Sequence, residues 1–428
     1  MTGPGEVIAC GDLAIEDDLI LALGESGKLA AGGLLPAGWQ PDRVLAGAGK
    51  LALPGLVNAH THSAMTLFRG FADDIALLPW LQQKIWPAEG RLTAEDVFWG
   101  ALLAVLEMLK SGTTCFADMY IFMEEVARAV ELAGIRASLA RGMMGSAPQD
   151  LGKLEQACEL AQAWQGKAGG RITWRLAPHS LYTCTRSFLE RVVERSEQLG
   201  LGIHLHLAET RAEVREVELT HGRTPVRLLE AMEVFRRPVL AAHCIQLDEE
   251  EMAILARRGV GVAHCPKSNM KLGSGVAPVA RMLETGVAVA LGTDAAASNN
   301  NLDLLQEMRT AALLQKVVHQ DPSVLPAYRA LELATRGGAR ALGLDREIGC
   351  LIPGRKADLI LIDLEKPHLY PRHDLVALVA YSAQASDVDT VIVNGEVVVE
   401  GGKVLTVDEA EVLREVDRRA KRLVQGLT

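Results

Sequence analysis

Histidines with the spacing of metal ligands occur early in this chain. His60 and His62 flank one threonine, and residues two apart in an extended segment point the same way, so both imidazoles could bind one ion. Two ordinary polar residues in a turn would give the same local pattern. The preceding run LPGLVNA favours the ligand pair, because its apolar residues predict a strand that ends at His60.

A second pair, His204 and His206, has the same spacing, and spacing alone does not decide which of the two would face a metal ion. Glu209 follows three residues after His206, which places a carboxylate near the ion without making it a ligand. A carboxylic acid there could protonate a ring nitrogen and later give a proton to leaving ammonia. The simplest alternative for His204 is a buried, hydrogen-bonded core residue.

Asp294 ends the segment GTD and precedes the polar loop AAASNNN. An aspartate after a strand is usually a helix cap, but such a polar loop is costly unless it is organised. Asp294 could bind the ion and accept the proton of an attacking water. His243 could hydrogen-bond that water, although a core histidine explains it almost as well, and His264 is better explained as structural.

Imidazole and carboxylate ligands predict one divalent ion, with Zn²⁺ the first choice and Fe²⁺ the second. Three histidines and one aspartate leave a position for water. The ion lowers the pKa of that water toward ~7, which makes hydroxide available at neutral pH.

These residues follow strands in an alternating pattern of strands and helices. Eight apolar runs predict strands at Leu53–His60, Thr113–Met119, Ala137–Met143, Thr173–Pro178, Gly202–Leu207, Val239–His243, Gly259–His264 and Val287–Gly292. The predicted helices between and after them are Ala94–Lys110, Met123–Ala133, Leu151–Gln165, Ser187–Leu199, Pro225–Met232, Glu249–Arg258, Pro278–Glu284 and Leu302–Lys316. Eight strand-helix units predict a closed (β/α)8 barrel, in which the carboxyl ends of the strands build the active site.

Both ends of the chain predict a second, smaller β domain. The N-terminal part is turn-rich, and strand patterns return after a helix at Tyr328–Leu342, with a hairpin turn at Asn394-Gly395. We expect the two ends to pair into one β-sandwich, followed by a charged helix at Asp408–Leu423. The predicted domains are residues 1–53 and 346–428 for the sandwich and its terminal helix, and residues 54–345 for the barrel.

Composition narrows the classes of partner. The chain has 428 residues, 49% of them hydrophobic, and a net charge of −10, which argues against a nucleic-acid groove or an anionic membrane surface as its main partner. Its seven cysteines form no CxxC pair, as expected for reduced thiols in a cytoplasm. The longest apolar runs are too short to span a bilayer. We therefore expect a cytoplasmic protein with a small-molecule substrate.

The motifs together resemble the amidohydrolase superfamily and, within it, the 5′-methylthioadenosine/S-adenosylhomocysteine deaminases. The resemblance runs from about Gly11 to Val399, with the motifs LPGLVNAHTHSAMTLFRG, WPAE, RGMMG, APHSLYTC, HLHLAET, AAHC, VAHCPKSNMKLGSG and LGTDAAASNNNLD. It implies hydrolytic deamination of the adenine ring of methylthioadenosine, S-adenosylhomocysteine or adenosine, giving an inosine-type product and ammonia. Barrels of this type often form symmetric assemblies, which leaves a homo-oligomer open.

The resemblance also implies roles for individual residues. The ion would be bound by His60, His62, His206 and Asp294, so the family pattern selects His206 over His204. Glu209 would carry a proton to the purine, and His243 would orient the hydroxide. The implied substrate contacts are Glu89 with the ribose hydroxyls, His179 with the purine, and Arg141 and Lys153 with the 5′ substituent. Without the resemblance, Glu89 would be read as a solvated residue in the first turn of a helix.

Two features distinguish this chain within the superfamily. Strand four ends in His179, where members with two metal ions usually carry a carboxylated lysine, so a single ion is expected. Lys153 occupies a position where some relatives carry a second arginine, and a lysine loses the two-pronged grip on a carboxylate. The alternatives are a hydrolase of another ring, such as a guanine-type deaminase or a chlorotriazine hydrolase, and a barrel that binds without catalysis.

Overall fold

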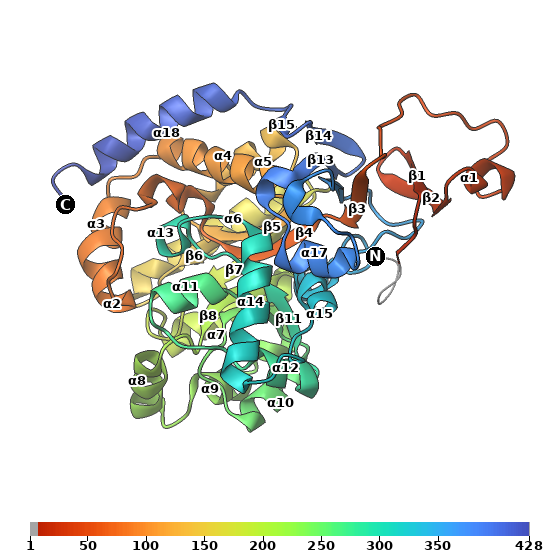
Figure 1. Cartoon of the computed structure of the whole chain (residues 1–428). Helices are drawn as coiled ribbons and strands as arrows, with labels where there is room; N and C mark the ends of the chain where they lie inside the picture. The colour runs from red at the N-terminus through yellow and green to blue at the C-terminus, as the bar shows by residue number, and fades with distance from the viewer. Residues whose placement is uncertain (1–6, 428) are drawn as a thin grey trace.

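In the computed structural model, which describes residues 7–427, eight parallel strands follow one another around one sheet in chain order (Figure 1). The eight strands are β4 (Leu56–Thr61), β5 (Thr113–Tyr120), β6 (Arg136–Met143), β7 (Ile172–Pro178), β8 (Gly202–Leu207), β9 (Val239–His243), β10 (Gly261–His264) and β11 (Ala288–Leu291). All eight predicted strands are present, and the (β/α)8 prediction is confirmed.

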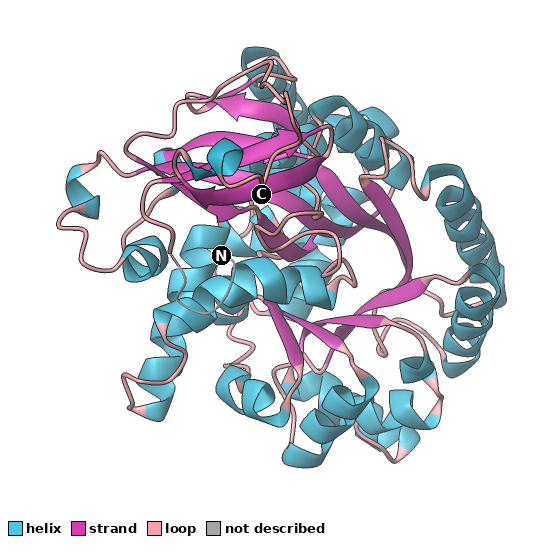
Figure 2. Cartoon of the chain, turned by 90° about the vertical axis from the view of Figure 1, so that its right-hand side faces the viewer, coloured by secondary structure: helices cyan, strands magenta, loops and turns pink. Residues whose placement is uncertain are grey.

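Helices cover the outside of this sheet (Figure 2). The larger ones are α4 (Ala94–Lys110), α5 (Met123–Ala133), α6 (Leu151–Trp164), α7 (Arg186–Leu199), α8 (Arg211–His221), α9 (Pro225–Ala231), α10 (Glu249–Arg258), α12 (Val279–Thr285) and α14 (Leu304–His319). The shorter ones are α2 (Leu77–Trp80), α3 (Trp86–Glu89), α11 (Pro266–Lys271), α13 (Ala296–Asn299), α15 (Ala327–Glu332) and α16 (Gly338–Ala341). Helix α8 was not predicted; Thr210 caps it by accepting a hydrogen bond from Glu213 N.

Hydrogen bonds between β4 and the end of β11 bring the two edges of the sheet together. Asp294 N donates to His60 O at 2.9 Å, Thr293 N donates to Asn58 Oδ1 at 3.0 Å, and Asn58 Nδ2 donates to Thr293 Oγ1 at 2.8 Å. This seam makes His60 and Asp294 neighbours although they lie far apart in sequence. It is the feature of the fold that assembles the site.

The predicted first strand, Leu53–His60, is two strands in the structure. Strand β3 (Lys50–Pro54) joins the small sheet, and β4 enters the barrel after Gly55. A Cβ on Gly55 would lie 2.0 Å from Thr114 Oγ1, so only glycine allows the chain to pass this close to β5. Hydrophobic periodicity runs through the break and could not reveal it.

The small domain has a five-stranded antiparallel sheet in the order β15-β14-β13-β12-β3. Its C-terminal strands are β12 (Leu359–Asp363), β13 (Val388–Val393), β14 (Glu396–Glu400) and β15 (Lys403–Val404). From the N-terminal part only β3 joins it, because β1 (Gly11–Glu16) and β2 (Leu19–Glu25) form a separate hairpin. Ile20 of that hairpin shares an apolar cluster with Leu359 and Ile392, so the two sheets pack together.

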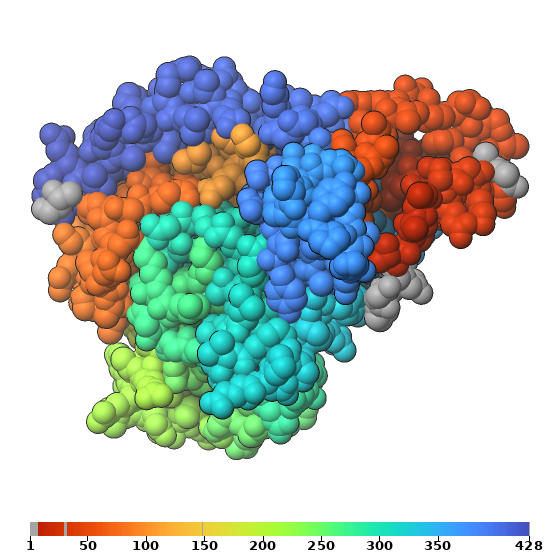
Figure 3. Space-filling model, viewed as in Figure 1, coloured from red at the N-terminus to blue at the C-terminus, as the bar shows by residue number. Residues whose placement is uncertain are grey.

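The remaining helices lie at the periphery. They are α1 (Lys28–Ala31), α17 (Leu375–Tyr381) and α18 (Glu409–Val424). Helix α18 lies along α4 (Figure 1). Buried Arg419 of α18 pairs with Asp96 of α4 at 3.0 Å. The segment around β1 and β2 projects from the body of the molecule (Figure 3).

In the part of the chain that is described, no helix is both long and apolar enough to cross a membrane. The start of the predicted first domain, residues 1–6, lies outside that part, and we retain the three domain boundaries as a proposal.

Candidate active site

Three histidines and one aspartate meet where strands β4, β8 and β11 end. His60 Nε2 and His62 Nε2 lie 3.5 and 3.4 Å from Asp294 Oδ1. His206 Nε2 lies 3.3 Å from His62 Nε2. The structure therefore brings together all four residues that the sequence resemblance assigned to a metal ion, and His206 is the histidine of β8 that faces the other three.

In two of these rings, the contact made by Nδ1 determines which ring nitrogen carries no hydrogen and is bare. His62 Nδ1 contacts Met119 O, and His206 Nδ1 contacts His179 O at 2.9 Å. A carbonyl oxygen only accepts, so both Nδ1 atoms carry hydrogen and both Nε2 atoms of neutral rings are bare. Two bare nitrogens 3.3 Å apart repel each other unless a cation lies between them.

Burial favours neutral rings at His60 and His206. It lowers the pKa of His60 to about 4 and holds the pKa of His206 well below the usual histidine value. His60 Nε2 is buried and has no hydrogen-bond partner among residues 7–427. An unpaired buried nitrogen, beside two bare nitrogens and a carboxylate, is the donor set of a divalent metal ion. These residues fit such an ion.

Two serines fix the orientation of Asp294. Ser268 Oγ donates to Asp294 Oδ2 at 2.6 Å, and Ser298 Oγ donates to the same oxygen at 3.1 Å. Oδ1 is therefore the oxygen that faces the histidines. Burial alone would raise the pKa of Asp294, but neighbouring histidines, His60 first, outweigh it and hold that pKa well below its usual value. Neither serine was identified as a site residue from the sequence, although both lie in the motifs VAHCPKSN and AAASNNN.

His204 lies behind His60 and does not join the cluster. Its Nε2 is 2.9 Å from His60 Nδ1, and its side chain is fully buried. A His60 ring that binds an ion through Nε2 carries its hydrogen on Nδ1, which makes His204 the acceptor. This pairing agrees with the expectation that His204 is a buried, hydrogen-bonded residue, and it gives that residue a task in orienting a ligand.

Replacing His204 tests that task. We expect His204→Phe to weaken metal affinity by about 10–100-fold, because the acceptor for His60 Nδ1–H is lost. His204→Gln can return an oxygen acceptor and should recover part of the affinity. Competition with a chromogenic chelator measures both. Wild-type affinity in the phenylalanine variant would contradict the assignment.

Glu209 and His243 lie beside the metal ligands. Glu209 is 4% exposed, and its burial raises the pKa of its carboxyl group, which favours the acid form that a proton donor needs. His243 Nε2 lies 3.9 Å from Glu209 Oε2, and its Nδ1 contacts Asn269 Oδ1 at 2.9 Å. Burial lowers the pKa of His243, but the charges of Glu209 and Asp294 outweigh it and the net shift is upward.

A second buried glutamate holds the turn that carries Glu209. Glu213 accepts hydrogen bonds from Glu209 N at 2.7 Å and from Ala208 N at 3.2 Å. Ala208 has a φ of +50°, a strained value for alanine that these bonds help to maintain. Burial raises the pKa of Glu213 to about 7. Glu213 was not identified from the sequence, although Thr210 and Glu213 have the spacing of a capping box.

Two of the predicted substrate contacts lie close to the cluster. His179 follows β7, and its ring centroid is 4.6 Å from that of His206. Glu89 ends helix α3 and accepts a 2.8 Å hydrogen bond from Tyr120 Oη at the end of β5. Tyr120 is in turn 6.3 Å from His62 between ring centroids. The structure therefore places Tyr120, which was not identified from the sequence, beside both Glu89 and His62.

The predicted contacts for the 5′ substituent differ from each other. Arg141 in β6 is half-buried, and in the described part of the chain it forms no ion pair; its one hydrogen bond, to Gly142 O, is 3.4 Å. Lys153 in α6 is already paired, with its Nζ 2.7 Å from Asp150 Oδ1.

His264 is fully buried at the end of β10 and is in neither potential ligand group that the described residues form.

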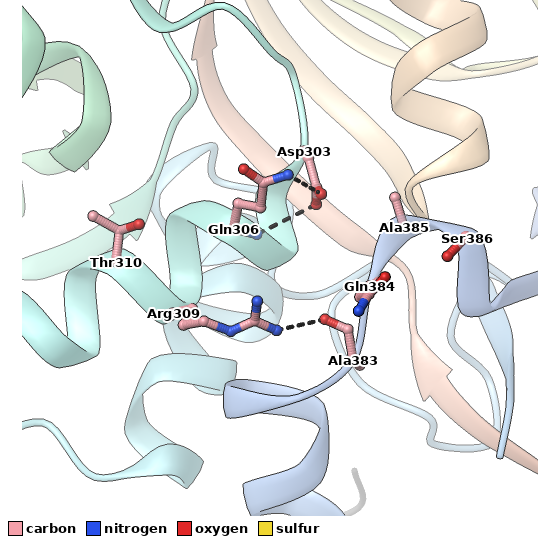
Figure 4. A pocket seen from close by; sticks show the side chains of 8 residues that line it. All are labelled: Asp303, Gln306, Arg309, Thr310, Ala383, Gln384, Ala385 and Ser386. Carbon is pink, nitrogen blue, oxygen red and sulfur yellow. Dashed lines mark hydrogen bonds between the residues drawn. The ribbon is translucent and has the colours of Figure 1, made fainter. Parts of the chain in front are cut away.

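A surface hollow of about 460 Å³ lies between α14 and the small domain (Figure 4). It is lined by Asp303, Gln306, Arg309 and Thr310 of α14 and its cap, and by residues 383–386 of the small domain. Arg309 donates to Ala383 O at 2.6 Å across it. None of the predicted site residues lines this hollow.

The chain matches the model of the Amidohydrolase family over residues 51–398. A 5-methylthioadenosine/S-adenosylhomocysteine deaminase of Moorella thermoacetica is 54% identical over 97% of this chain and 96% of its own. The enzyme of that name from Syntrophomonas wolfei is 53% identical over 99% and 97%. Both alignments therefore cover nearly the whole of each chain.

Three solved structures have a similar fold over more than 90% of this chain. A zinc-bound adenosine deaminase from Xanthomonas campestris has a TM-score of 0.93 at 35% identity, covering 98% of this chain and 94% of its own. The guanine deaminase of E. coli has a TM-score of 0.81 at 25% identity, covering 91% and 93%. An atrazine chlorohydrolase from Arthrobacter aurescens has a TM-score of 0.85 at 24% identity over 96% and 95%, which shows a common fold.

Proposed function

The chain belongs to the amidohydrolase family, and from this we propose that it is a metal-dependent deaminase of the adenine ring. Its substrates would be 5′-methylthioadenosine, S-adenosylhomocysteine or adenosine, and its products the inosine-type nucleoside and ammonia. One observation carries the proposal: a buried carboxylic acid, Glu209, lies beside a group of three histidines and one aspartate that fits a metal ion. Relatives above 50% identity that are named for this reaction support it.

We propose Zn²⁺ as the ion and Fe²⁺ as the second choice. His60, His62, His206 and Asp294 would bind one ion, and imidazole with carboxylate suits zinc. When bound, the ion acidifies water and so supplies the nucleophile at neutral pH. The similar adenosine deaminase was solved with zinc, which supports the choice.

The protein's own groups would handle the protons. Asp294 Oδ1 would accept the proton of the attacking water, since Ser268 and Ser298 already engage Oδ2. Glu209 would protonate N1 of the purine, which makes C6 electrophilic. Water then adds to C6. Glu209, now deprotonated, takes the proton of the new C6 hydroxyl and gives it to the amino nitrogen, so that the C6–N bond breaks and ammonia leaves. The proton that Asp294 took from water restores the acid form of Glu209. His243, held by Asn269, would hydrogen-bond the incoming oxygen.

Other side chains would select the substrate. Glu89 would accept hydrogen bonds from the two ribose hydroxyls, and His179 would contact the purine. Arg141, half-buried and without an ion-pair partner among the described residues, would face the 5′ substituent. Lys153 is neutralised by Asp150, so we propose that it adds little to the binding of an amino-acid carboxylate. A cytoplasmic location completes the proposal, which leaves the oligomeric state open.

A panel of substrates tests the reaction. The loss of adenine absorbance would be followed with methylthioadenosine, S-adenosylhomocysteine and adenosine, and product analysis would cover guanine and a chlorotriazine. We expect turnover of at least one adenosine and release of one ammonia per product. Turnover of guanine or the triazine alone would refute the proposal in favour of another amidohydrolase activity, and no turnover by the metal-loaded protein would favour a binding protein.

A further inference from the structure

Tyr120 and Glu89 come from separate segments and meet close to His62, one of the predicted metal ligands. Tyr120 is the last residue of β5, and Glu89 ends the short helix α3 in the long connection between β4 and α4. The phenol Oη donates a 2.8 Å hydrogen bond to Glu89 Oε1. Tyr120 is only 6% exposed, and burial and the charge of Glu89 hold the pKa of its phenol well above the usual value. The phenol therefore keeps its hydrogen and stays a donor.

Among residues 7–427, Tyr120 is the only hydrogen-bond partner of the Glu89 side chain. A carboxylate can accept about four hydrogen bonds, so most of its capacity remains for a ligand. A glutamate side chain also has several rotatable bonds, and ordering them when a ligand binds costs free energy. The phenol removes part of that cost before the ligand arrives.

Tyr120 lies in a buried barrel strand, close to the predicted metal ligand His62. Tyr120 belongs to a barrel strand that is buried throughout, and its ring lies 6.3 Å from the ring of His62 between centroids. Met119, the residue before it, contacts His62 Nδ1 through its carbonyl oxygen. The same two residues of β5 thus contact a metal ligand and the Glu89 carboxylate. The end of β5 would therefore set the position of a ligand bound by Glu89 relative to the predicted metal ligands.

We propose that Tyr120 is a positioning residue, which fixes the Glu89 carboxylate so that it recognises the vicinal hydroxyls of a ribose. The inference rests on the proposed deamination of adenosines and on Glu89 as the ribose contact. It predicts that the phenol determines how strongly the protein prefers a ribonucleoside to the 2′-deoxyribonucleoside.

The test is Tyr120→Phe, which removes the donor and keeps the ring. KM, kcat and metal content would be measured with adenosine and 2′-deoxyadenosine. We expect KM for adenosine to rise roughly tenfold, with kcat within about twofold and metal content unchanged, because one charge-assisted hydrogen bond is lost. The preference in kcat/KM for adenosine over 2′-deoxyadenosine should fall by a similar factor. In a Glu89→Ala background the same substitution should have no further effect.

Tyr370→Phe is the matched control. It removes another tyrosine-glutamate hydrogen bond, from Tyr370 Oη to Glu365 Oε2 at 2.7 Å, on the exposed surface of the small domain. It should leave KM and the ribose preference unchanged. Thermal melting of both variants detects any general loss of stability.

The outcomes separate the inference from the proposed function. If the wild-type protein prefers adenosine and Tyr120→Phe keeps that preference, the inference is wrong while the function stands. A fall in kcat together with metal loss would assign Tyr120 to the support of His62 and would also overturn it. A wild-type protein that deaminates none of the adenosines refutes the proposed function, and this inference with it.

Discussion

Replacing Glu209 with glutamine should lower kcat by roughly 10²–10⁴-fold, because the amide cannot give a proton to the purine ring. Glutamine has nearly the same shape, and the backbone of this turn is held by Glu213 through Glu209 N and Ala208 N. The turn should therefore stay in place, and the metal content should match that of the wild-type protein. Steady-state rates with the best substrate of the panel and metal analysis of the same sample measure both.

The contrast between rate and metal content makes this variant informative. A glutamine variant that keeps more than about a tenth of the wild-type kcat would exclude Glu209 as the proton donor. Loss of the ion in the same variant would mean that Glu209 supports the metal site instead. Glu216→Gln is a suitable control, since Glu216 is an exposed residue of α8 with no assigned role, and it should have wild-type rates.

His206→Ala should abolish both metal binding and activity. The variant removes one of three imidazoles, the one whose Nε2 lies 3.3 Å from His62 Nε2. Three remaining ligands bind a divalent ion far more weakly, and without the ion no acidified water is available. We expect less than about 1% of the wild-type kcat/KM, measured together with the metal content of protein purified without chelators.

His221→Ala is the control for this variant, because His221 is an exposed residue at the end of α8. It should retain the metal and the activity. If His206→Ala kept a full complement of ion, the ligand set would be wrong. If it lost the ion and still turned over substrate, the metal would not be part of the reaction.

The barrel could be predicted from the sequence because its strands are short apolar runs that alternate with amphipathic helices. Helices α4, α5 and α10 have the predicted bounds, Ala94–Lys110, Met123–Ala133 and Glu249–Arg258. Thr93 and Asp248 start the first and last of these with capping boxes, and Gly134 and Gly259 end α5 and α10 with positive φ. Local signals of this kind stand in the sequence itself.

What sequence reasoning missed depends on contacts between distant segments. Only the closed fold gives the reason for the break at Gly55, which is the approach of Thr114. The choice between His204 and His206 required the family pattern, because a period of two puts both on one face. The pairing of Tyr120 with Glu89 joins a strand end to a separate loop, and no spacing rule predicts such a contact.

The predicted β-sandwich shows the same limit. The sequence indicated strands at both chain ends, and they are present, but the partners of each strand were not predictable. Of the N-terminal strands, only β3 joins the five-stranded sheet of the small domain, whereas β1 and β2 pair with each other. Strand pairing is decided by side-chain packing across the sheet, here around Ile20 and Ile392.

Anomalous diffraction at the zinc absorption edge, from crystals of the zinc-loaded protein, tests the central claim most directly. We expect one anomalous peak per chain, about 2.0–2.2 Å from His60 Nε2, His62 Nε2, His206 Nε2 and one oxygen of Asp294. A peak that lacks contact with Asp294 or His206, or two peaks of equal height in the barrel mouth, would contradict the four-ligand, single-ion site on which the proposed deamination depends.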